Sequence, residues 1–304
     1  MLTREFGKRA DVADSSWRDY YALTKPRVVQ LLVFTAVIGM FLSTPGMVPW
    51  DVLVFGSLGI GLAAASGAAV NHVLDRRFDA TMTRTRGRPL PMGRVSERDA
   101  MAFALALGLI GIGMLTLLIN PLTAVLTFFA LIGYAVVYTV YLKRATPQNI
   151  VIGGAAGAAP PVLGWAAVQN DVPGYALLLF LIIFTWTPPH FWALAISRKS
   201  DYEKAEIPML PVTHGVAVTK SFVFYYTILL VIVTLLPYLT GMSGPLYLIA
   251  ALFLGSGFLY YAIVLKRTDD SRVAQRTFHY SISYLVALFT FLLLDHYEPL
   301  LWSA

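Results

Sequence analysis

Three oxygen-bearing side chains recur at intervals of four residues in the segment NHVLDRRFDATMTRTRGRPLP, at Asn71, Asp75 and Asp79. An α-helix turns by about 100° and rises about 1.5 Å per residue, so the three side chains share one face over roughly 12 Å. Mg²⁺ holds oxygens at about 2.1 Å and combines one or two carboxylates with phosphate oxygens and water. The pattern predicts a site for Mg²⁺ and a diphosphate, with Asn71, Asp75 and Asp79 as metal ligands and the two aspartates as catalytic residues.

The alternative is a helix end trimmed with ordinary polar residues and neutralised by nearby arginines. Arg76 and Arg77 lie about 100° and 200° around a helix from Asp75, so they do not cover the acidic face. The basic segment RTRGRPLP that follows favours the diphosphate site, because the planar fork of arginine matches phosphate oxygens. We predict that Arg84 and Arg88 bind the substrate through its phosphates.

A second charged loop, SRKSDYEKAEIPMLP, contains no pair of carboxylates four residues apart. Pro208 and Pro211 end any helix soon after it, so a loop or a short helix is expected. Asp201 is the candidate for an additional Mg²⁺ contact, and Lys199 is a candidate substrate-binding residue. A solvated charge cluster is the alternative for this loop.

A histidine lies within an apolar segment, in WTPPHFWALAI at His190. Ionisable residues inside a membrane are costly and are functional candidates, so we predict a catalytic or substrate-contacting role, with a hydrogen-bonded packing group as the alternative.

Tyr134, Tyr138 and Tyr141 recur at helical spacing, and this face could lie against a planar ligand or a carbocation. Core packing is the commoner reason for such a stripe.

Two further polar residues flank a short loop in YLKRATPQNIVIGG. Lys143 and Asn149 are predicted to bind the substrate at the same level as the acidic face. Three other histidines, His72, His214 and His279, are near the ends of apolar segments, where we expect them to be solvated.

The composition identifies an integral membrane protein. Hydrophobic residues make up 57% and charged residues 13% of the 304 residues, and the mean hydropathy is +0.67, well outside the range of a soluble domain. Apolar runs long enough to cross a bilayer recur along the chain. They predict an all-α polytopic protein of about nine transmembrane helices around a central cavity, at residues 28–44, 52–73, 100–119, 122–142, 149–168, 174–196, 219–238, 245–265 and 278–295.

The basic residues test this count. If the chain crosses nine times, all 23 lysines and arginines fall on one side. By the positive-inside rule the N-terminus is cytoplasmic and the C-terminus is outside. The net charge of +6 therefore reports topology and not nucleic-acid binding. The first 24 residues have no apolar core, so no cleaved signal is expected, and the absence of cysteine excludes disulfides and thiolate metal sites.

The long loops and the paired prolines indicate where the active face and its cavity lie. The longest connections, at residues 75–98 and 197–217, are both cytoplasmic in this topology, which places the active face there. Pro160–Pro161 and Pro188–Pro189 should break or kink two spans and open a cavity below that surface. We divide the chain into a polar cytoplasmic segment at residues 1–24 and a single transmembrane domain at residues 25–304.

The motifs resemble those of a known family. NxxxDxxxD followed by RPLP is similar to the UbiA-type intramembrane prenyltransferases. Further segments resemble one branch, the protohaem IX farnesyltransferases: YALTKPRV at 21–28, YLKRATPQNIVIGGAAGAAPPVLGW at 141–165, PPHFWALAI at 188–196, DYEKAEIPMLPV at 201–212 and FHYSISYL at 278–285. The resemblance covers the chain from Tyr20 onward.

The resemblance implies a nine-helix fold in the bacterial cytoplasmic (inner) membrane, Mg²⁺ as cofactor, and farnesyl diphosphate and haem B as substrates, with haem O as product. It implies that Asn71, Asp75 and Asp79 bind the Mg–diphosphate, that Arg88 and Lys143 contact phosphate, and that His190 lies near the haem or its vinyl group. A haem A synthase is a candidate partner, because haem O is a precursor of haem A, and the sequence leaves open whether the two proteins bind. The second DxxxD of the wider family is missing, which leaves the number of ions open.

Three other functions are alternatives. A related prenyltransferase would use an aromatic quinone precursor as acceptor. A CDP-alcohol phosphotransferase would need a DGxxAR segment upstream of the acidic helix, and the sequence lacks one. A transporter of haem or cations would need polar residues on the outer side of its spans, where this sequence has almost none.

Overall fold

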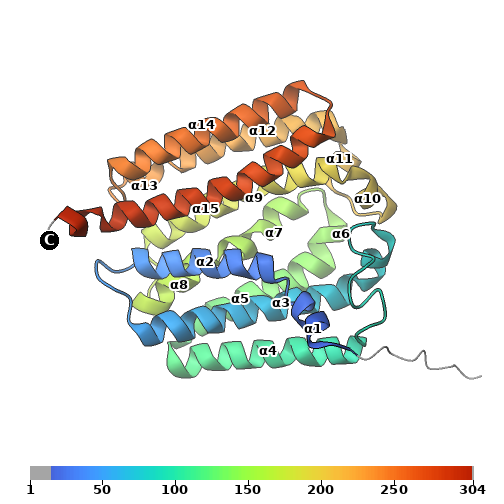
Figure 1. Ribbon diagram of the computed structural model, residues 1–304, viewed down its shortest axis with the longest axis horizontal. Helices are drawn as coiled ribbons and strands as arrows, with labels where there is room; N and C mark the ends of the chain where they lie inside the picture. The colour runs from blue at the N-terminus through green and yellow to red at the C-terminus, as the bar shows by residue number, and fades with distance from the viewer. Residues whose placement is uncertain (1–14, 303–304) are drawn as a thin grey trace, which may run out of the picture.

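Long apolar helices lie side by side in the computed structural model, which describes residues 15–302 (Figure 1). The first half of the chain forms α1 (Trp17–Leu23), α2 (Pro26–Leu42), η1 (Val52–Gly56), α3 (Ser57–Thr81), α4 (Glu97–Leu118), α5 (Pro121–Ile132), η2 (Gly133–Leu142), α6 (Lys143–Ala145) and α7 (Asn149–Ala158). The second half forms α8 (Pro160–Gln169), α9 (Gly174–Ser197), α10 (Lys199–Lys204), α11 (Leu210–Thr213), α12 (Gly215–Val233), α13 (Leu236–Leu239), α14 (Pro245–Arg267) and α15 (Ser271–Trp302). The described residues contain no strand, which confirms the all-α prediction.

Eight of the helical segments are long and apolar enough to cross a membrane, within the described part of the chain. The count reaches nine when α1 and α2, which meet at a bend of 53°, are taken as one span. The predicted number of spans therefore agrees with the structure. Residues 1–14 of the predicted N-terminal segment lie outside the described residues.

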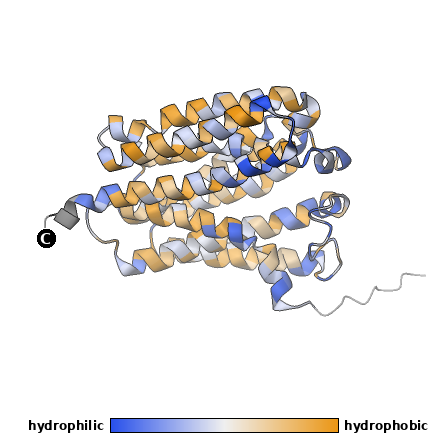
Figure 2. Cartoon of the chain, turned by 45° about the horizontal axis from the view of Figure 1, so that its top comes forward, coloured by the Kyte–Doolittle hydropathy of each residue, from blue (hydrophilic) through white to orange (hydrophobic). Residues whose placement is uncertain are grey.

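Most of each long helix is hydrophobic (Figure 2), and many of its large apolar side chains are exposed. Leu117 is 82% exposed and Phe253 is 77% exposed. Helices satisfy their own backbone hydrogen bonds, so a surface of this kind is stable in a lipid environment and not in water. The hydrophilic residues gather mainly at one end of the bundle, which carries the 82–96 loop, α6, α10 and α11 and which we call the basic end.

Close packing between α2 and α8 depends on two glycines. A Cβ atom added at Gly39 would collide with the backbone of Pro161, and one added at Gly164 would collide with the backbone of Ala36. Backbones can approach this closely only where one partner lacks a side chain, as is usual for helices in membranes. This contact ties the first span to the middle of the chain.

The two proline pairs behave differently. α7 ends at Ala158 and Pro160 begins α8, so the predicted break is present as a one-residue interruption at Ala159. In contrast, α9 continues through Pro188 and Pro189 without interruption. Both prolines are buried, and α9 packs against α7, α12 and α15 along its length. These neighbours hold α9 together where the local sequence favours a break.

A buried carboxylate at the other end of the bundle links the last two spans. Asp295, in α15, accepts hydrogen bonds from the backbone N–H groups of Gly244 at 2.5 Å and Tyr247 at 2.9 Å. These N–H groups lie at the start of α14, where helix amides lack partners and the helix dipole favours negative charge. Asp295 therefore caps α14 from a neighbouring helix.

Candidate active site

The acidic face of α3 exists as predicted and is buried. Asn71 is 4% exposed, Asp75 is 2% exposed and Asp79 is 4% exposed. The Asn71 amide donates to Asp75 Oδ2 at 2.9 Å and to Thr139 Oγ1 at 3.1 Å. These contacts confirm that Asn71 and Asp75 share one helix face, which points toward η2.

Three cations from three separate segments neutralise this face. Lys25, at the start of α2, donates from Nζ to Asn71 Oδ1. Lys143 Nζ lies 2.5 Å from Asp75 Oδ2, and Arg88 Nη1 lies 2.6 Å from Asp79 Oδ2. Charge-assisted hydrogen bonds of this kind offset the cost of burying carboxylates close together. The structure thus brings the predicted residues Arg88 and Lys143 to the acidic face.

The oxygen donors of this face fit Mg²⁺. Asp75 Oδ1 is buried and has no hydrogen-bond partner, and Arg144 Nη2 lies 3.9 Å from it. Within residues 15–302, no three His, Cys, Asp or Glu side chains are grouped to enclose a metal ion. Mg²⁺ commonly binds through one or two carboxylates and completes its shell with substrate phosphates and water. The site therefore suits an ion that arrives with an anionic substrate.

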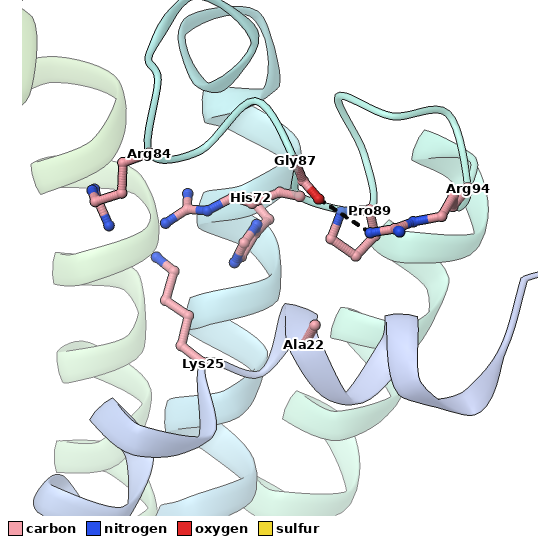
Figure 3. A pocket seen from close by; sticks show the side chains of 8 residues that line it. Ala22, Lys25, His72, Arg84, Gly87, Pro89 and Arg94 are labelled. Carbon is pink, nitrogen blue, oxygen red and sulfur yellow. Dashed lines mark hydrogen bonds between the residues drawn. The ribbon is translucent and has the colours of Figure 1, made fainter. Parts of the chain in front are cut away.

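A basic cavity of about 420 Å³ opens beside the acidic face (Figure 3). The Lys25 side chain extends toward the 82–96 loop, and His72 lies beside it. Arg94 is held at the rim by its hydrogen bond to the Gly87 carbonyl and by its salt bridge to Asp19 at 3.1 Å. Its lining residues are Ala22, Lys25, His72, Arg84, Gly87, Arg88, Pro89 and Arg94. A cavity with this charge attracts a phosphate or a carboxylate.

The local backbone explains how Lys25 reaches Asn71. Lys25 has φ 49° and ψ 59°, a left-handed conformation that is costly for a residue with a side chain. The next residue, Pro26, begins α2, and the chain bends sharply between α1 and α2. Strained residues of this kind concentrate at functional sites. Sequence reasoning missed Lys25, although the motif YALTKPRV contained it.

The tyrosine stripe is only partly as predicted. Tyr134 and Tyr138 stack with their ring centres 5.8 Å apart and their planes 11° apart, and Lys25 donates to the Tyr134 hydroxyl at 3.4 Å. Tyr141 is 66% exposed and does not share their face, so its inclusion was wrong. The reason is that residues 133–142 form a π-helix, whose wider turn changes which positions align.

The remaining predicted residues separate into two groups. Asn149 is fully buried and donates to the Lys143 carbonyl at 3.4 Å, so it supports the segment that presents Lys143. Asp201 is 6% exposed, in α10. By contrast, Lys199 is paired with Glu203 at 3.1 Å, and its side chain is 39% exposed. No contact joins Asp201 or Lys199 to the acidic face, so their roles stay predictions.

The surroundings of Tyr202 indicate that α10 lies near the 82–96 loop. Burial raises the pKa of the Tyr202 hydroxyl, while the nearby charges of Arg84, Arg198 and Arg88 act in the opposite direction. Two of these arginines also line the basic cavity. The second charged loop therefore approaches the first at the basic end.

The four histidines near span ends or within spans have different surroundings. His190 is buried, and its Nδ1 lies 2.6 Å from Ser281 Oγ on α15. His72 is 2% exposed and neither ring nitrogen has a hydrogen-bond partner. The expected solvation of His72 was wrong, because the 82–96 loop folds over it. His214 and His279 are exposed, as predicted.

The sequence matches the model of the UbiA prenyltransferase family over residues 32–291. The chain belongs to the UbiA prenyltransferase family. Among its UbiA relatives, a protoheme IX farnesyltransferase of Methylococcus capsulatus is 60% identical over 98% of this chain and 99% of its own length. One from Thioalkalivibrio sulfidiphilus is 62% identical over 95% of each chain. The predicted family and branch are confirmed.

Solved structures share the UbiA fold. A digeranylgeranylglyceryl phosphate synthase superposes with a TM-score of 0.77 at 19% identity, covering 92% of this chain and 98% of its own. A UbiA homologue from Archaeoglobus fulgidus, bound to DMAPP and Mg²⁺, superposes with a TM-score of 0.61 at 18% identity over 90% and 99% of the two chains. At this identity the agreement concerns the helical architecture.

Proposed function

We propose that this chain transfers the farnesyl group of farnesyl diphosphate to a vinyl group of haem B, giving haem O and diphosphate. The observation that carries the proposal is the acidic face of α3 with cations on three sides. Lys25, Lys143 and Arg88 reach it from segments far apart in the sequence. Such an arrangement suits a metal–diphosphate, which presents positive charge to carboxylates and negative charge to lysine and arginine.

Asn71, Asp75 and Asp79 would hold Mg²⁺, which stabilises the negative charge of the departing diphosphate. Asp201 is the candidate for a further metal contact. The phosphate oxygens accept hydrogen bonds from Lys25, Arg84, Arg88 and Lys143. These cations stabilise the negative charge that develops on the diphosphate as the bond between carbon and oxygen breaks. Lys25, Arg88 and Lys143 are already held at the acidic face by hydrogen bonds before the substrate arrives, so these three donors need little reorganisation.

The acceptor must reach the allylic cation before water does. The terminal vinyl carbon forms the new carbon–carbon bond as the bond between farnesyl carbon and diphosphate oxygen breaks. Water then adds to the neighbouring carbon to give the hydroxyl of haem O, and the released diphosphate takes up the proton that water loses. Tyr134 and Tyr138 form a stacked pair of rings, and Lys25, which lines the cavity, donates to the Tyr134 hydroxyl. Aromatic faces stabilise a nearby cation and exclude water, so they suit the allylic end of the farnesyl chain.

We place the enzyme in the bacterial cytoplasmic (inner) membrane with its active face toward the cytoplasm. The basis is the charge distribution: the basic end of the bundle carries the long loops and most of the lysines and arginines. Both substrates are amphipathic and can enter from the lipid bilayer. A haem A synthase that accepts haem O from this enzyme is the proposed partner.

The test uses the purified full chain with isotopically labelled farnesyl diphosphate and either haem B or 4-hydroxybenzoate. We expect label in haem O only, loss of activity with EDTA, and recovery on adding Mg²⁺. Label in the benzoate product alone would refute the proposal in favour of a quinone-pathway prenyltransferase. Full activity in EDTA would refute the metal role of the acidic face.

A further inference from the structure

The imidazole of His190 is enclosed on both faces. Trp186 stacks on one side, with ring centres 4.1 Å apart and planes 21° apart, and Phe278 stacks at 4.6 Å and 30°. Phe191 meets it edge-on at 4.9 Å. With its flat faces and one edge packed, the ring cannot rotate freely, and any ligand must approach it through an exposed ring atom.

The hydrogen bonds of Ser281 fix which nitrogen carries the proton. Ser281 Oγ donates its only hydrogen to the Phe278 carbonyl at 2.6 Å. It must then accept from His190, whose Nδ1 lies 2.6 Å away. Trp186 Nε1 donates to the Ser281 carbonyl at 2.8 Å and so holds the serine in place. His190 therefore carries its proton on Nδ1, and Nε2 keeps a lone pair.

That lone pair has no partner in the fold. None of the described residues donates a hydrogen bond to Nε2, and Nε2 is not among the partnerless polar atoms that the protein buries completely. His72 differs, because both of its nitrogens are completely buried and without partners. An immobile histidine with one nitrogen hydrogen-bonded and the other open is the arrangement found in histidines that bind metals.

We propose that Nε2 of His190 is the axial ligand of the iron in the haem substrate. The inference rests on haem B being the acceptor, as proposed above, and adds how it is held. A bond from Nε2 to iron would anchor the haem at α9, next to the exposed edge of the imidazole. Ser281 acts as a positioning residue, because its hydrogen bond selects the tautomer and the direction of the ring.

The test is a spectroscopic titration of the purified full chain with haem B. We expect the absorption and electron paramagnetic resonance signature of histidine-ligated iron in the unaltered protein. His190→Gly should lose that signature and regain it when imidazole is added. His279→Gly, at an exposed neighbouring histidine, should keep it. Iron-free protoporphyrin IX should bind the unaltered chain and His190→Gly equally, which shows that the variant is folded.

Ser281→Ala provides an independent check, because it leaves the histidine in place. It should weaken haem affinity by about tenfold or more while leaving protoporphyrin IX binding unchanged, as is usual when the group that orients a metal ligand is removed. A histidine signature that survives in His190→Gly, or that disappears in His72→Ala instead, would overturn the assignment.

Turnover separates this inference from the proposed function. If the unaltered protein shows the His190 signature but makes no haem O, the proposed reaction fails and the ligation stands. If it makes haem O while its bound haem lacks a histidine ligand, the ligation fails and the reaction stands.

Discussion

Replacement of Lys25 by methionine tests whether the acidic face depends on the start of α2. Methionine keeps much of the side chain's length and removes the ammonium group that donates to Asn71 Oδ1 and, at 3.4 Å, to the Tyr134 hydroxyl. A hydrogen bond that involves a charged group contributes about 1.5–3 kcal/mol. If this amount is lost from the transition state, kcat/KM for farnesyl diphosphate falls roughly 10- to 150-fold.

A glycine at the same position separates charge from backbone strain. The left-handed conformation of Lys25 costs about 1–3 kcal/mol for a residue with a side chain, and glycine adopts it freely. Lys25→Gly should therefore lose activity as Lys25→Met does, yet unfold at a higher temperature than Lys25→Met. Both quantities are measurable on purified protein by labelled product formation and thermal unfolding in detergent.

A double-mutant cycle with Asn71→Ala completes the test. If Lys25 acts partly by orienting Asn71, the double variant should lose less activity than the product of the two single losses, because contacting residues couple. Turnover of Lys25→Met within twofold of the unaltered enzyme, or strictly additive losses in the cycle, would refute this reasoning.

Three further perturbations address the metal site and the fold. Asp75→Ala and Asp79→Ala should each lower haem O formation by about 100-fold or more, because each removes a carboxylate that would hold Mg²⁺ at the diphosphate. Both variants should still insert into the membrane. Near-normal turnover in both would contradict the metal role. Asp295→Ala leaves the Gly244 amide at the start of α14 without its acceptor and should lower stability by about 1–3 kcal/mol, measured by thermal unfolding, with KM for farnesyl diphosphate unchanged. Gly164→Ala forces α8 away from α2 and should destabilise by about 1–3 kcal/mol, whereas Gly157→Ala, where a Cβ meets nothing within 4 Å, is the control and should be tolerated.

Local patterns predicted the parts of the site that depend on one helix. The four-residue spacing of Asn71, Asp75 and Asp79 aligns them on α3 regardless of the rest of the fold, and the structure contains that alignment. The long apolar runs likewise define the spans. Arg88 was predicted from the basic segment that follows the acidic face. Lys143 was predicted from the family resemblance and its place at the same level, and both residues contact the face.

Contacts between distant segments could not be predicted in the same way. Lys25 lies 46 residues from Asn71, and its approach requires a left-handed residue between two helices. Nothing in the spacing of Tyr134, Tyr138 and Tyr141 reveals a π-helix, because that geometry arises where the chain packs. Burial of His72 depends on the path of the 82–96 loop, which only tertiary structure determines.

The balance of charge around α3 indicates what the site is built to bind. Two carboxylates, Asp75 and Asp79, form the acidic face. The basic groups that contact it or line the neighbouring cavity outnumber them, even without Arg94, which is paired with Asp19: Lys25, Arg84, Arg88 and Lys143. A site for a bare cation would have the opposite excess, since each added lysine or arginine repels the ion. The surplus of positive charge is balanced when the occupant is a polyanion that carries its own metal. The same arrangement argues against a passage for free cations, which would meet this basic cavity at the entrance.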